Sequence, residues 1–109
     1  MKGTIKDLLK ISGVYGYSIA RGNTIQVKLP SKHRFADAKQ RIQHLYESLM
    51  EESNKPGNII EIYLEDIVLT IFLSGSTMLM VISNGLTNLA LLRMTGKLVL
   101  ATLVKEKHK

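Results

Sequence analysis

The sequence predicts an α/β protein of the α+β type, a three-layer sandwich in which a five-stranded, mostly antiparallel sheet carries a long helix on one face and two helices on the other. Three observations predict this fold class. Apolar residues recur with a helical period in three segments, they alternate or run together in five others, and three of those five follow one another through short turns. Only one connection between strands contains a helix, which argues against a doubly wound parallel sheet. The element order α-β-β-α-β-β-β-α fills residues 1–109 as a single domain.

The first helix and the first hairpin are short. Apolar side chains three and four residues apart predict an amphipathic helix over residues 4–11, which the following Ser-Gly pair ends. Residues 14–20 favour extended structure, and residues 21–23, Arg-Gly-Asn, have the composition of a turn. Residues 24–29 then alternate polar and apolar side chains without interruption. Together these segments predict a hairpin whose second strand buries every other residue.

A long helix follows the hairpin. Residues 33–53 carry an apolar stripe at successive intervals of three, four, three and four residues, formed by Phe35, Ala38, Ile42, Leu45 and Leu49. Tyr46 and Met50 lie beside this stripe and widen it. The wider apolar face has two interpretations. Either the long helix contacts a second neighbour, or it makes a broader contact with the same core.

Three strands and a helix make up the rest of the chain. Residues 58–65 have the alternation of a strand, and residues 67–73 and 78–82 are almost continuously apolar, which predicts central strands buried on both faces. The last segment, residues 86–104, has a helical period and a basic end that suits the helix dipole. Its second half, residues 98–104, also fits a strand, and both interpretations stay open.

Composition limits the function classes. The chain is 45% hydrophobic and 22% charged and has no cysteine, which excludes a disulfide framework, a thiolate nucleophile and cysteine-bound zinc. Its start lacks the continuous apolar run of a signal peptide. Turn residues divide the long uncharged tract of residues 67–92 into pieces shorter than the ~20 residues needed to cross a bilayer. We therefore expect a cytoplasmic protein without a membrane span and with a flexible tail over residues 105–109.

The net charge of +6 is unevenly distributed along the chain. Residues 1–41 carry nine Lys and Arg against two acids, residues 42–66 one against six, and residues 67–109 five against one. The acidic middle argues against a uniform polyanion-binding face. The Gly-x-x-Gly sequence of residues 13–16 has apolar and aromatic residues where a KH-type nucleic-acid loop is basic. A basic nucleic-acid-binding domain is therefore kept only as an alternative to a basic solvated surface.

No catalytic or metal-binding pattern is complete. His33 and His44 lie eleven residues apart on the long helix, which separates them by about 16 Å, so they cannot share a metal. Residues 95–97, Thr-Gly-Lys, lack the first glycine and the final hydroxyl residue of a phosphate-binding loop. The Gly-x-Ser-x-Gly elbow of serine hydrolases is also missing. We expect a protein that is not an enzyme and holds no cofactor and no metal.

Two parts of the sequence resemble the Roadblock/dynein light chain family. Residues 8–19, LLKISGVYGYSI, are similar to the opening of these domains, in which a helix ends in a Gly-Val-x-Gly turn before the first strand. Residues 78–82 and 88–93 are similar to the family's last strand and the start of its final helix, with Ala90 where many relatives have glycine. Because the element order also agrees, the resemblance covers nearly the whole chain and points to an MglB-like bacterial or archaeal member.

The resemblance implies a homodimeric platform, without a catalytic centre of its own, that binds a Ras-like small GTPase or a larger scaffold. In the family the dimer forms through the long helix and the third strand, which joins two sheets edge to edge, and here those elements are residues 33–53 and 58–65. The expected interface residues are Tyr46, Met50, Ile59, Glu61, Ile62 and Tyr63. The third strand also has only one strand next to it in sequence and is too apolar for an exposed edge. A small-molecule sensor on the same fold is the remaining alternative.

The arginines bear on how such a platform would act on a GTPase. Arg21 lies in the predicted turn, whereas Arg34, Arg41 and Arg93 lie on predicted helices, whose rigid backbone restricts insertion into an active site. An arginine finger would therefore be Arg21. We expect instead that no arginine is inserted and that the platform holds the GTPase's own groups in a reactive arrangement.

Overall fold

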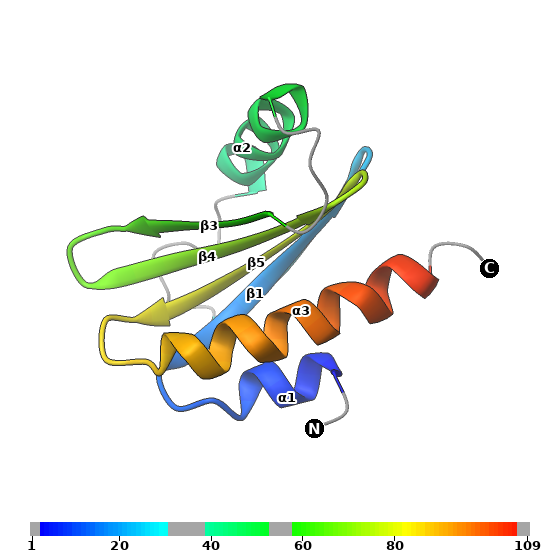
Figure 1. The fold of residues 1–109 in the computed structure, drawn as a ribbon. Helices are drawn as coiled ribbons and strands as arrows, with labels where there is room; N and C mark the ends of the chain where they lie inside the picture. Colours follow the sequence, from blue (N-terminus) through cyan, green and yellow to red (C-terminus); the bar gives the residue numbers. More distant parts are fainter. Residues whose placement is uncertain (1–2, 31–38, 53–57, 107–109) are drawn as a thin grey trace.

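A computed structural model describes residues 3–30, 39–52 and 58–106, which form one five-stranded sheet with helices on both faces (Figure 1). The elements in chain order are α1 (Ile5–Leu9), β1 (Val14–Arg21), β2 (Thr24–Lys28), α2 (Lys39–Glu52), β3 (Asn58–Tyr63), β4 (Ile67–Ser74), β5 (Thr77–Asn84) and α3 (Leu89–Glu106). The strand order is β2-β1-β5-β4-β3, and every neighbouring pair is antiparallel. The predicted fold class and element order are confirmed.

The sheet separates two apolar clusters, one on each face. Because successive side chains of a strand point to opposite faces, Leu79 and Val81 of β5 face α1 and α3, whereas Met78, Met80 and Ile82 face α2. Figure 1 shows α1 and α3 side by side against one face of the sheet and α2 against the other. The long helix and the two other helices therefore occupy opposite faces, as the sequence predicts.

The central strands β4 and β5 are buried on both faces, as their continuous apolar sequences predict. α3 packs against both of them. It approaches β4 at Gly96, where a Cβ atom would overlap the ring of the fully buried Phe72. Beyond this glycine α3 continues without a break, and Val99, Leu100 and Leu103 face the core at helical spacing. Residues 98–104 are therefore helix and not strand.

The start of α3 differs from the prediction. The helix begins at Leu89 and not at residue 86. The side-chain oxygen of Asn84 accepts hydrogen bonds from the Leu86 amide at 2.9 Å and from the Thr87 hydroxyl at 3.1 Å, which holds these residues in a turn. The Asn88 side chain then caps the first turn of the helix. The apolar period that begins at residue 86 thus includes a turn residue, Leu86, whose side chain is 95% exposed.

Two other predicted boundaries can be compared in part. Within the described residues α2 begins at Lys39, and residues 33–38 and 53 of the predicted long helix lie outside them. α3 continues to Glu106, so the first two residues of the predicted flexible tail are helical. The rest of that tail, residues 107–109, lies outside the described residues.

Candidate interaction surface

The strand β3 forms one edge of the sheet. Among the described strands it pairs with β4 alone. Its side chains alternate between the two faces, with Ile60 and Ile62 packed on the α2 cluster and Ile59 packed on the α1–α3 cluster. At its end Tyr63 is 64% exposed and Leu64 is 39% exposed. β3 is therefore anchored in both layers of the core while its outer edge is apolar and aromatic.

The backbone of β3 carries hydrogen-bonding groups that point away from the sheet. Leu64 and Ile67 form a mutual pair, in which the Leu64 N–H donates to the Ile67 carbonyl at 2.8 Å and the Ile67 N–H donates to the Leu64 carbonyl at 3.3 Å. Such pairs alternate along an antiparallel ladder, so the residues two and four positions earlier bond to β4. Ile59, Glu61 and Tyr63 therefore direct their N–H and C=O groups outward. This free edge of β3 matches the donor and acceptor pattern of another antiparallel strand.

An ionic cluster fastens β3 to α3 beside this edge. The Glu61 carboxylate accepts two hydrogen bonds from the Arg93 guanidinium, at 2.7 Å from Nε and 2.9 Å from Nη2, and a third at 3.2 Å from the Tyr63 hydroxyl. The hydrogen bonds from Arg93 lower the pKa of Glu61, and partial burial opposes this. Desolvation and the neighbouring carboxylate raise the pKa of Tyr63, and the same carboxylate raises the pKa of Arg93. The bidentate pair thus keeps Glu61 ionised and holds its side chain toward α3.

The face of the sheet that carries α2 is only partly covered by the described residues. α2 packs against β2, and two of its residues, Ile42 and Tyr46, are buried in the cluster on this face. Around them lies a set of half-buried apolar side chains, namely Ile25, Val27, Leu29, Leu45, Leu49, Met50, Ile60 and Ile62. The apolar surface of this α2 face therefore extends from the helix to the free edge of β3.

Tyr46 has a role within the protomer. Its hydroxyl accepts a hydrogen bond from the Gly22 amide at 2.9 Å and donates one to the Ser76 carbonyl at 2.6 Å. It thereby ties α2 to the turns of both the β1–β2 and the β4–β5 hairpins. Because only 5% of Tyr46 is exposed, it has almost no surface for contact with a partner. Met50, the other residue beside the predicted stripe, is half-buried in the same cluster.

The structure brings four of the six expected interface residues together on β3, namely Ile59, Glu61, Ile62 and Tyr63. Sequence reasoning missed Arg93, whose pairing with Glu61 spans 32 positions and has no local signal. It also misplaced Arg21. This residue is the last one of β1, paired with Thr24 and Thr77, and is not part of the hairpin turn.

Among the described residues, the structure places the Thr-Gly-Lys sequence and the side chains of the types that ligate metals. No group of three His, Asp or Glu side chains within them is arranged as metal ligands. The Thr-Gly-Lys sequence of residues 95–97 lies in the middle of α3 and not in a loop that could enclose a phosphate. None of the described helices is both long and apolar enough to pass through a membrane.

Helices α1 and α3 on one face, α2 on the other, and a 2-1-5-4-3 antiparallel sheet with β3 at its edge define the chain as a domain with the Roadblock fold. The structure is similar to a Roadblock/LC7 domain from Streptomyces avermitilis, with a TM-score of 0.77 over 98% of this chain and 96% of that chain at 9% identity. It is also similar to MglC from Myxococcus xanthus, with a TM-score of 0.63 over 95% of each chain at 11% identity. No protein-family model and no curated protein matches the sequence, so the likeness is one of fold.

Proposed function

We propose that the protein is a non-enzymatic adaptor or regulator that works as a homodimer. The two copies pair edge to edge through β3 and the adjoining α2 face, with Met50, Ile59, Glu61, Ile62 and Tyr63 at the interface. The observation that carries this proposal is the free edge of β3, with its outward backbone groups and its apolar side chains. Pairing of two antiparallel copies of this edge would satisfy those groups and continue the sheet from one protomer into the other.

The two edges of the sheet differ in a way that favours this assignment. Exposed edges in monomeric proteins are usually protected by lysine, proline or a bulge. β2 has such protection, because Thr24, Gln26 and Lys28 are exposed along it and Pro30 follows. β3 has the sequence NIIEIY, without lysine or proline, and its register with β4 is regular over six residues. An edge of this kind favours pairing with another strand.

The partner strand in this proposal is the β3 of a second copy. The surface next to β3 is apolar, so it can pack against the same surface of another protomer. Stable interfaces bury about 800 Å² on each partner, which is more than the pairing of two short strands supplies. The half-buried apolar side chains that α2 and β3 contribute to this face, namely Leu45, Leu49, Met50, Ile60 and Ile62, supply the rest. A two-fold axis at β3 buries the same residues on both copies, as closed dimers require.

Light scattering at micromolar concentration tests the dimer. The wild-type protein should have about twice the mass of its 12.2 kDa chain. Glu61→Pro removes one outward N–H and leaves the bonds to β4 in place, so it should be monomeric, whereas Glu61→Ala, which also lacks the carboxylate, should remain a dimer. A monomeric wild type contradicts the proposal, and a dimeric Glu61→Pro protein contradicts the use of this edge.

The partner we propose for the dimer is a Ras-like small GTPase or a larger scaffold. Support comes from the resemblance of the sequence to the Roadblock/dynein light chain family and from the shared fold. Calorimetry tests binding to the first kind of partner. It uses small GTPases whose genes lie near the gene for this protein, each loaded with GDP or with a non-hydrolysable GTP analogue. The protein alone should bind no nucleotide, because its Thr-Gly-Lys sequence lies within a helix. Tight binding of nucleotide to the protein alone would contradict the adaptor role.

A further inference from the structure

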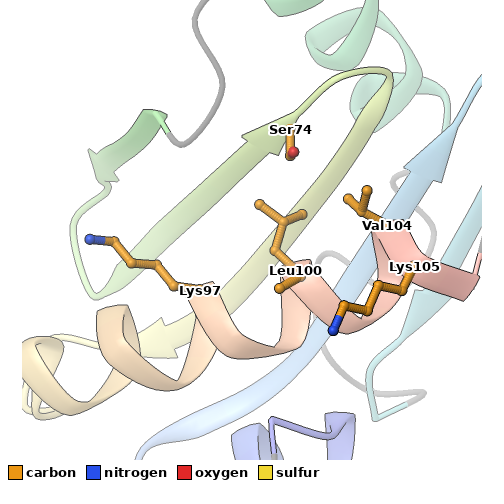
Figure 2. Close-up of a pocket in the computed structure, with 6 residues that line it drawn as sticks. Ser74, Lys97, Leu100, Val104 and Lys105 are labelled. Carbon is orange, nitrogen blue, oxygen red and sulfur yellow. The ribbon is translucent and has the colours of Figure 1, made fainter.

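A pocket of about 540 Å³ lies between the C-terminal half of α3 and the end of β4. It is lined by Ser74, Lys97, Leu100, Ala101, Val104 and Lys105. Figure 2 shows Leu100 pointing from α3 toward Ser74, with Lys97 and Lys105 on either side along the helix. This α3 pocket is made by a single protomer and lies on the face of the sheet opposite α2, so its occupancy is separable from the proposed dimer.

The chemistry of the α3 pocket is amphipathic. Leu100, Ala101 and Val104 give it an apolar floor, and the pocket is within the size range of sites that enclose one large side chain or a small ligand. Both lysines are exposed, and neither has an ion-pair partner among the described residues. The described lining residues include no acid that would neutralise them. These features suit an occupant that combines an apolar group with negative charge on both sides of it.

The charge of Arg93, one turn before Lys97 on the same side of α3, is not available to such an occupant. Glu61 already binds it through two hydrogen bonds. Neither Glu61 nor Arg93 lines the pocket, and the positive charge beside it lies at Lys97 and Lys105. These two residues are eight positions apart on the helix, so their Cα atoms are separated by about 12 Å.

We propose that the α3 pocket binds an extended acidic–apolar segment of a partner protein with the pattern acid-x-apolar-x-acid. In an extended chain the first, third and fifth side chains point to the same side, and the first and fifth are about 13 Å apart. This spacing matches the distance between the two lysines. The central apolar side chain enters the pocket over Leu100, and each carboxylate pairs with one lysine.

An NMR titration tests the proposal. The ¹⁵N-labelled protein is titrated with a nine-residue peptide that has glutamate at its third and seventh positions, leucine at its fifth, and serine or threonine elsewhere. We expect saturable shifts of amides at Ser74 and along residues 97–105. A peptide with both glutamates replaced by glutamine should bind roughly tenfold more weakly, the sum of two exposed ion pairs, and added salt should weaken the binding of the acidic peptide. Equal binding of the two peptides, or shifts elsewhere, overturns the proposal.

Matched variants make the test specific to the α3 pocket. Ala101 and Ala90 are both exposed on α3, but only Ala101 lines the pocket. Ala101→Glu should abolish binding of the acidic peptide by charge repulsion, whereas Ala90→Glu should leave it unchanged. The double variant Lys97→Gln/Lys105→Gln should bind the acidic peptide roughly tenfold more weakly. Replacing two exposed lysines of other elements by glutamine should have little effect on this affinity.

The same variants distinguish a membrane from a protein partner. Vesicles of phosphatidylglycerol offer negative charge and apolar chains without the spacing of the peptide. If the wild-type protein binds these vesicles through Lys97 and Lys105 and does not bind the peptide, the α3 pocket is a lipid site and the proposal is wrong. The mass of the dimer in light scattering should be the same for every variant of the pocket, which separates this result from a failure of the proposed assembly.

Discussion

Gly96 is a position of close contact between α3 and the sheet, and replacing it tests how tightly the helix is packed. A Cβ atom in Gly96→Ala would overlap Cζ, Cε1 and Cε2 of Phe72. Phe72 lies on the central strand β4 and is fully buried, so its ring has no free space to move into. The added methyl group must therefore displace the helix or the ring.

Two opposing free energies set the size of the effect. Alanine favours the helix over glycine by about 1 kcal/mol. Overpacking of a core by one methyl group costs about 1–3 kcal/mol and occasionally more, and the overlap with three ring atoms puts this position at or above the upper end. We expect Gly96→Ala to lower the free energy of unfolding by about 2 kcal/mol, which corresponds to a fall in Tm of roughly 10 °C.

Thermal and urea unfolding, followed by circular dichroism, measure this change. The matched control is Gly85→Ala, because a Cβ atom there meets no atom within 4 Å. Its stability should stay within about 0.5 kcal/mol of the wild type. In the double variant Phe72→Leu/Gly96→Ala the smaller side chain makes room for the methyl group, so the combined loss should be less than the sum of the two single losses. A Gly96→Ala protein as stable as the wild type would refute the close packing of α3.

Four further outcomes are expected. Tyr46→Phe should destabilise the fold by about 1–3 kcal/mol in urea unfolding, because the two hairpin groups that bond to its hydroxyl lose their partner. Ile62→Lys should abolish the dimer in light scattering, whereas Ile25→Lys, a half-buried position on the opposite edge strand, should leave it intact. The lowered pKa of Glu61 means that its pairing stabilises the fold above the ordinary carboxyl pKa, and this stability is lost as the pH falls through the lowered value. Glu61→Gln should therefore make the urea midpoint less sensitive to acid. If the protein stimulates GTP turnover by a partner GTPase, the Arg21→Ala variant should stimulate it equally. A loss on the order of 10³ in the rate of turnover would show an arginine finger.

Periodicity, turn residues and chain connectivity were sufficient to predict a five-stranded, mostly antiparallel sheet, but not the pairing of β1 with β5. The uninterrupted apolar runs of β4 and β5 predict central strands because only a strand covered on both faces tolerates them. The position of β3 at an edge follows from its having one neighbour in sequence, and the structure confirms it. Features of this kind depend on local pattern and chain connectivity, which a single sequence contains.

Contacts between distant side chains could not be predicted in the same way. The widening of the α2 stripe at Tyr46 left two interpretations open, and in the structure the Tyr46 hydroxyl bonds to two hairpin turns of the same protomer, 24 and 30 positions away. The bond between Glu61 and Arg93 depends on how α3 packs on the sheet, which no spacing in the sequence encodes. The delayed start of α3 arises from a side-chain hydrogen bond of Asn84 that competes with the apolar period.

The outward edge of β3 also determines where other binding surfaces would lie in an assembly. Two antiparallel strands are related by a two-fold axis perpendicular to their common sheet, so both protomers keep α3 on the same side of it. Two copies of the α3 pocket would then open in one direction from a single rigid platform. A partner with two acidic–apolar segments on a flexible tether would bind the second copy as an intramolecular step, at an effective concentration in the millimolar range. Weak single sites would in this way give tight and dimer-dependent capture of a bivalent partner.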